Sequence, residues 1–164
     1  MKKILKIVAL VAALGFIAIQ FKRPNRNNPP ENAADTMEAR MNVPADVKAV
    51  LDRSCADCHS HRTTWPFYTN IAPISWQVAD HVFEGREKLN FSVWGTYEPR
   101  RQRRKLHQIC EQVESAAMPL PQYLYIHRDA KMSPQDIQTL CNWTKAEEVK
   151  LQAAQPQASP TPEK

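Results

Sequence analysis

The stretch RSCADCHSH, residues 53 to 61, places two cysteines and two histidines close together. Such a cluster suits covalent attachment of haem c, a redox dithiol, or half of a zinc site. Haem attachment requires the order C-x-x-C-H, in which the cysteines reach the two vinyl groups and the histidine coordinates iron. Cys55, Cys58 and His59 have this order. The motif therefore favours one covalent haem c, with Cys55 and Cys58 as thioether sulfurs and His59 as the proximal iron ligand.

The rest of the chain gives less support to the two alternatives. A redox C-x-x-C normally begins a helix beside a βαβ sheet, and no segment here alternates convincingly enough for a strand. A zinc site normally takes two of its four ligands from a second close pair. Cys110 and Cys141 stand far apart in the sequence, so zinc would need four scattered ligands.

The elements that must position the motif are predicted to be helices, which makes the fold class all-α. Residues 44–53 carry apolar side chains on one face and lead directly into the motif. A helix over 74–84 should end at Gly85, a suitable C′ residue. A longer helix is predicted over 98–116. The last helix begins with a capping box at Ser133.

Iron held by His59 needs a ligand on its other side or leaves an open position. Met118 lies in AAMPLP, between the long helix and the last one, where a thioether can be presented to iron. Methionine is more often core filler, but the need for a sixth ligand favours Met118 as the distal ligand. Other histidines compete less well, His61 because it is too near His59 and His107 because it lies beside its helix stripe. The remaining alternatives are His127, His81 and an open position.

The N-terminus predicts an uncleaved membrane anchor. Residues 4–21 are apolar apart from Lys6, Gly15 and Gln20. About 18 helical residues nearly cross a hydrocarbon core of roughly 30 Å, and Lys6 can reach the headgroups. A cleaved signal peptide is the alternative, although Ala13-Leu14-Gly15 is a poor cleavage site. Basic residues flank both sides, so charge does not orient the segment.

Composition then divides the chain into four parts. Residues 1–23 are the predicted signal anchor or transmembrane helix, and 24–43 are a polar, proline-bearing extended linker. Residues 44–150 form the haem-binding domain, and 151–164 a disordered tail. The net charge of +5 suits an acidic protein partner or an anionic membrane surface. The sequence shows no basic surface interleaved with aromatic residues, so nucleic-acid binding is not predicted.

Two longer stretches, CADCHSHRTTWPFYTNIAPISWQVADHVFEGREKLNFSVW and AAMPLPQYLYIHRDAKMSPQDIQTLCNW, carry a family resemblance. They resemble the small bacterial haem-binding domain proteins, distant relatives of monohaem cytochrome c. The entry stretch FIAIQFKRPNRNNPP is also similar to that family, so the resemblance runs from about residue 16 to 143. The resemblance implies a cytochrome-c-like fold, with haem c on Cys55 and Cys58, His59 proximal and Met118 distal. It also implies a single-pass protein of the bacterial inner membrane with its haem domain in the periplasm, because haem c is attached on that side.

Two further features lie outside the resemblance. Cys110 and Cys141 fall on core-facing stripes of two predicted helices, so a disulfide can form in an oxidising periplasm, and two buried thiols are the alternative. Arg100 to Lys105 form a dense basic run. This run suits a solvated face, docking to an acidic redox partner, pairing with haem propionates, or contact with anionic lipid.

These features together predict one-electron transfer at the periplasmic face of the membrane, with redox partner proteins that the sequence does not identify. Filled His/Met coordination suits a carrier because it leaves no site for a substrate. The alternative is a haem-based sensor or small-ligand-binding protein with a labile sixth iron position. An enzyme such as a peroxidase is less favoured, because no separate acid–base constellation stands out.

Overall fold

The computed structural model describes residues 1–154, and its regular elements within that range are all helices. The predicted all-α class is therefore confirmed for the described part of the chain. The α-helices are α1 (Lys2–Ile19), α2 (Met37–Arg40), α3 (Ala45–Ser54), α4 (Ala56–His59), α5 (Ile74–Lys88), α6 (Pro99–Glu114), α7 (Pro121–Leu124) and α8 (Pro134–Ala153). Short 3-10 helices lie between them at η1 (Ala33–Asp35), η2 (Phe67–Asn70), η3 (Phe91–Thr96) and η4 (Arg128–Ala130).

The described helices belong to two compact units. The first unit consists of residues 1–30 and 57–90, and the second consists of residues 31–56 with the described residues from 91 onward. The first therefore contains α1, η2 and α5, and the second contains α3, α6, α7 and α8. The boundary passes through the CADCH motif, because Ala56 belongs to the second unit and Asp57 to the first.

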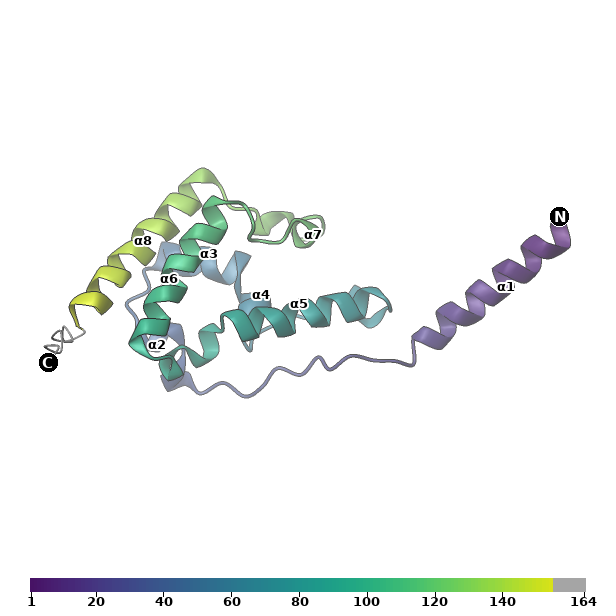
Figure 1. Ribbon diagram of the computed structural model, residues 1–164, viewed down its shortest axis with the longest axis horizontal. Coiled ribbons are helices and arrows are strands. Elements are labelled where there is room, and N and C mark those ends of the chain that lie inside the picture. The colour runs from purple at the N-terminus through teal and green to yellow at the C-terminus, as the bar shows by residue number, and fades with distance from the viewer. Residues whose placement is uncertain (155–164) are drawn as a thin grey trace, which may run out of the picture. The chain divides into compact units, whose positions relative to one another are not determined.

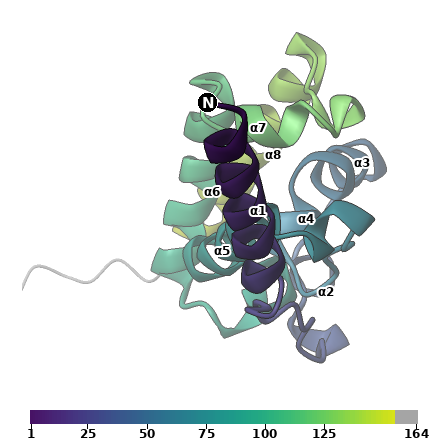
Figure 2. The same ribbon diagram turned by 90° about the vertical axis from the view of Figure 1, so that its right-hand side faces the viewer.

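The second unit is built on α6 and α8, which lie side by side (Figures 1 and 2). Both helices repeat apolar residues at helical spacing, so each has one face to bury. The buried face of α6 consists of Leu106, Ile109, Cys110 and Val113, and that of α8 includes Leu140, Cys141 and Trp143. Cys110 and Cys141 form a disulfide between these two faces, with their Cα atoms 4.9 Å apart.

The start of α8 is fixed by local polar contacts. Ser133 and Asp136 form the predicted capping box, with the Asp136 carboxylate accepting from the Ser133 amide at 2.8 Å. That amide, together with the nearby Arg53 guanidinium, holds the pKa of Asp136 below its usual range. Arg53 donates to the same carboxylate at 2.9 Å. The cap of α8 is thereby tied to α3, the helix that leads to CADCH.

In the first unit, the chain leaving α1 is held against η2 and α5. Gln20 and the backbone of Ala72 exchange two hydrogen bonds, of 3.1 and 2.9 Å. Arg26 donates to the Thr69 carbonyl at 3.0 Å, and the Trp76 indole donates to the Lys22 carbonyl at 2.7 Å. Polar side chains after α1 therefore fix this stretch against the rest of its unit.

The segment 24–43 differs from the predicted extended linker. Its second half contains η1 and α2, and Met37 at the start of α2 is only 1% exposed. Asn32 and Thr36 cap these short helices through their side-chain oxygens. At the other end of the chain, α8 includes residues 151–153 and Ala154 is its C-cap, and residues 155–164 of the predicted disordered tail lie outside the described residues.

No helix within the described residues is long and apolar enough to span a membrane. The predicted transmembrane anchor is not supported in that form. Helix α1 begins at Lys2 and ends at Ile19, so its 18 residues include Lys2, Lys3 and Lys6. The predicted span instead started at Ile4 and used residues up to Phe21, which lies beyond the helix end.

The disulfide provides a first test of how the second unit is stabilised. Its cysteines are separated by 31 residues, and closing a loop of that size stabilises by about 3–4 kcal/mol in the chain-entropy model. We expect the double variant Cys110→Ala/Cys141→Ala to lose about that much free energy of unfolding in urea. Dithiothreitol should lower the parent's midpoint and leave the variant's unchanged. Equal midpoints for oxidised parent and variant would contradict this role.

Candidate functional site

The CADCH motif follows directly on the end of α3. Val47, Val50 and Leu51 bury one face of α3, and the Cys55 amide donates to the Leu51 carbonyl at 3.0 Å. The single turn of α4 then carries Cys58. Both cysteines are half-buried, and neither takes part in a disulfide. Cys55 thus follows the last turn of α3, and Cys58 lies in the single turn of α4.

His59 is held by the C-terminal end of α5. Its Nδ1 lies 2.9 Å from the Gly85 carbonyl oxygen and 3.0 Å from that of Leu89. A carbonyl oxygen only accepts, so Nδ1 carries the proton and the ring's lone pair lies on Nε2. Metal-bound histidines commonly use this pairing, in which one ring nitrogen donates to a fixed acceptor and the other coordinates. The half-buried His59 ring thus has the tautomer of an iron ligand.

Gly85 does not end its helix, contrary to the expectation from sequence. Helix α5 continues to Lys88, and the backbone becomes extended at Leu89. A Cβ atom at position 85 would lie 2.6 Å from the Cys58 carbonyl oxygen, closer than van der Waals contact permits. Glycine is needed here because α5 approaches the backbone of the motif, which brings the two acceptor carbonyls within reach of His59.

The loop after the motif is closed by its own polar groups. The Thr63 hydroxyl donates to the Asp57 carbonyl at 2.6 Å, and the Thr64 amide donates to the Asp57 carboxylate at 3.0 Å. Ser60 and Thr63 are both buried. These contacts fold the chain back immediately after His59 and fix the direction in which the loop leaves the motif.

Arg86, next to Gly85 on α5, binds this loop. Its Nε donates to the Ser60 carbonyl at 2.8 Å, and one terminal nitrogen donates to the Thr63 hydroxyl at 2.8 Å. The guanidinium also donates to the Asn27 carbonyl at 3.1 Å and the Asn28 side-chain oxygen at 2.7 Å. A planar fork of five donors can hold several acceptors at once. Sequence reasoning missed Arg86, because no local pattern distinguishes it from other helix-surface arginines.

The motif's second cysteine has an unfavourable setting for a thiolate. Burial and, to a smaller extent, the Asp57 carboxylate raise the pKa of the Cys58 thiol to about 11, while Arg86 acts in the opposite direction. Burial therefore favours the protonated form of this thiol.

Met118, the expected distal ligand, lies in the second unit, just past α6. Ala116 adopts a left-handed conformation with φ of 56°, and the Ala117 and Met118 amides both donate to the Gln112 carbonyl, at 3.0 and 3.1 Å. This is a Schellman-type helix end, in which alanine occupies a position that favours glycine. The turn presents Met118 half-buried, immediately after the helix.

The histidines that are alternatives to Met118 as the distal ligand lie in four different environments. His127 stacks on Tyr123 with ring centroids 4.1 Å apart. The His61 Nε2 lies 2.9 Å from the Asn90 amide nitrogen. The His107 side chain is 71% exposed, near Glu148. His81 is half-buried on α5.

A metal site built on the other two cysteines is also disfavoured. Ligand atoms of Cys110, Glu114 and Cys141 lie within 4.8 Å of one another. Because the two sulfurs are bonded to each other, neither is available as the thiolate that zinc requires. Among the described residues, the cysteines and histidine of CADCH are thus a donor set that fits haem, with two sulfurs for the porphyrin and one imidazole for its iron.

Comparison with known proteins supports the same class. A model of the haem-binding domain family matches residues 14–146, which is most of the chain. No curated protein and no solved structure matches. A chain whose described elements are all helices, with this donor set and this match, is a haem protein. It belongs to the haem-binding domain family, and its cofactor is haem.

The close approach at Gly85 can be tested with a matched glycine. Gly85→Ala should destabilise the haem-loaded protein by about 1–3 kcal/mol, because overpacking against the Cys58 carbonyl forces α5 away from the motif. Gly15→Ala is the control, since Gly15 is also helical and a Cβ there meets nothing within 4 Å. Both changes favour helix formation equally. Denaturant unfolding gives the comparison, and equal stability of the two variants would rule out the proposed contact.

Proposed function

We propose that this protein is a monohaem c-type cytochrome that transfers single electrons at the periplasmic face of the bacterial plasma membrane. The observation that carries the proposal is the pair of carbonyl acceptors on His59 Nδ1, at 2.9 and 3.0 Å. They fix the imidazole in the tautomer that binds iron and increase its basicity. A histidine directly after C-x-x-C that is held in this way suits a proximal haem ligand.

In this proposal the two cysteines and the histidine of CADCH each have one role in a cytochrome-c-like domain. Cys55 and Cys58 would hold haem through thioether bonds to its two vinyl groups, and His59 would be the iron ligand through Nε2. Haem, when bound, supplies the ferric/ferrous couple. The chain holds His59 rigidly through α5, and Arg86 fixes the loop that follows it. Rigid ligands suit electron transfer because little rearrangement accompanies a change of iron charge.

Met118 is proposed as the distal ligand. Its thioether is borne on a turn whose amides are anchored to the Gln112 carbonyl, so the residue has a defined local conformation. A methionine ligand raises the reduction potential and fills the sixth position. A filled position favours a carrier over a haem-based sensor or a peroxidase, both of which need iron open to a small molecule.

The proposed partner is a redox protein at the membrane. Arg100 and Arg104 of the basic run are exposed on α6, whereas Arg101 stacks over the Tyr97 ring at 4.0 Å. The exposed charges suit an acidic docking surface. The Cys110–Cys141 disulfide supports an oxidising compartment such as the periplasm. The exposed apolar side chains of α1 support retention at the membrane.

The central test is an absorption spectrum of the full chain matured in a host that attaches haem c. Haem should remain with the polypeptide on a denaturing gel, and Cys55→Ser/Cys58→Ser should abolish this. Met118→Ala should lose the thioether-to-iron charge-transfer band, lower the reduction potential and allow rapid carbon monoxide binding to the reduced protein.

Met132→Ala is the matched control for Met118→Ala, because Met132 is also half-buried and also follows a helical turn. It should leave the spectrum unchanged. An unchanged spectrum in Met118→Ala would exclude this ligand. Rapid carbon monoxide binding by the parent would instead favour the sensor.

The proposed location makes a separate prediction. The full chain should sediment with membranes, and added protease should cleave it in spheroplasts, because the haem domain faces the periplasm. Replacing residues 1–23 with a cleavable export signal should release haem-loaded protein into the soluble periplasmic fraction. Protection of the full chain from protease in intact spheroplasts would contradict the location.

A further inference from the structure

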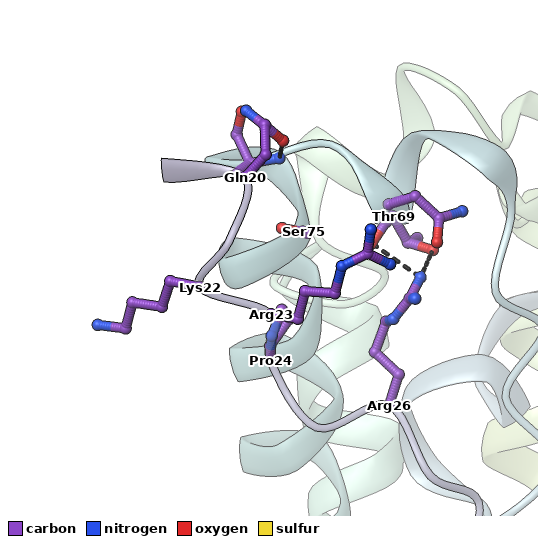
Figure 3. A pocket seen from close by; sticks show the side chains of 9 residues that line it. Gln20, Lys22, Arg23, Pro24, Arg26, Thr69 and Ser75 are labelled. Carbon is purple, nitrogen blue, oxygen red and sulfur yellow. Dashed lines mark hydrogen bonds between the residues drawn. The ribbon is translucent and has the colours of Figure 1, made fainter. Parts of the chain in front are cut away.

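A small pocket lies in the first unit beside the segment that leaves α1 (Figure 3). Its cavity volume is about 10 Å³, so the site is a shallow depression open to solvent, and a ligand would lie at its mouth. Its walls come from the end of α1, the residues after it, η2 and the start of α5. The lining residues are Gln20, Lys22, Arg23, Pro24, Arg26, Thr69, Asn70, Ala72 and Ser75. This lining contains cationic and neutral polar side chains and no carboxylate.

The two arginines converge at this pocket. Arg26 is fixed by hydrogen bonds to the Thr69 carbonyl at 3.0 Å and the Thr69 hydroxyl at 3.1 Å. The guanidinium of Arg23 extends toward the same side of Thr69 (Figure 3). No described residue forms an ion pair with either arginine. Two cations held near each other repel, and an anion between them would turn that repulsion into attraction.

A buried hydroxyl adds a neutral donor to the pocket. Ser75 lies in the first turn of α5 and is only 3% exposed. Its side chain lines the pocket. The peptide dipoles at this end of α5 also favour negative charge. The hydrogen bonds between Gln20 and Ala72 hold the wall beside Ser75 in place.

We propose that this pocket binds a phosphate-type oxyanion between Arg23 and Arg26, with the Ser75 hydroxyl as a further donor. The phosphate can come from the headgroup of an anionic phospholipid or from free inorganic phosphate. The pocket lies directly after the exposed apolar helix α1, where lipid headgroups would be within reach. The proposal does not depend on haem ligation.

The first experiment titrates inorganic phosphate into the haem-loaded full chain in a neutral detergent, with sodium chloride adjusted to hold ionic strength constant. We expect saturable binding that weakens about tenfold or more in Arg23→Gln/Arg26→Gln, because two charge-assisted contacts are lost. Ser75→Ala should weaken binding less, by about fivefold, since one neutral donor is lost.

The matched control is Arg100→Gln/Arg104→Gln, which removes the same charge from exposed positions on α6. It should bind phosphate like the parent. Arg23→Gln alone guards against unfolding, because Arg23 is exposed and has no ion-pair partner among the described residues. Absence of saturation, or equal weakening in the control, would overturn the proposal and show only general attraction of anions to a basic chain.

A second experiment separates the two sources of phosphate. Vesicles of phosphatidylcholine, with or without about one third phosphatidylglycerol, are added to the phosphate-loaded protein. Displacement of bound phosphate by the anionic vesicles alone, absent in Arg23→Gln/Arg26→Gln, identifies a lipid headgroup site. Phosphate binding that neither vesicle changes identifies a site for the free ion.

Discussion

The hydrogen bonds from the His59 ring to the Gly85 and Leu89 carbonyls are the constraint on which the site depends. They require the backbone of α5 to lie against the motif, so no side chain fits at position 85. They also require the helix to end at Leu89, where the backbone becomes extended. The same few residues therefore set the ring's tautomer, its orientation and the path of α5.

Arg86 extends that constraint to the surrounding chain. Arg86 comes directly after Gly85. Gly85 allows α5 to approach the backbone of the motif, and Arg86 holds the loop that follows His59 through hydrogen bonds. Its contacts with Asn27 and Asn28 also join the segment after α1 to this loop. One short stretch of α5 thus holds the iron ligand, the loop after it and part of the predicted linker.

The features that could be predicted from the sequence are those that depend on residues close together in the chain. The spacing of CADCH, the capping box at Ser133 and the apolar stripes of α6 and α8 are all read from neighbouring residues. Gly85 was misinterpreted because a helix C′ position and a close backbone approach both select glycine, and only the tertiary contact with Cys58 distinguishes them. Arg86 was missed because its acceptors lie 26 and 59 residues away. Polar composition at 24–43 predicted an extended chain, yet Met37 is buried there.

The arginines of the first unit show why contacts, and not charge alone, decide function. Arg86 is directed at backbone and side-chain oxygens of its own unit, and burial lowers its pKa while the fork remains satisfied. One terminal nitrogen of Arg26 donates to the carbonyl and the hydroxyl of Thr69, and Arg23 has no ion-pair partner among the described residues. Arg86 therefore has a structural role. Arg23 and Arg26 leave positive charge facing a pocket whose lining contains no carboxylate, and an incoming anion is the simplest group that would neutralise both.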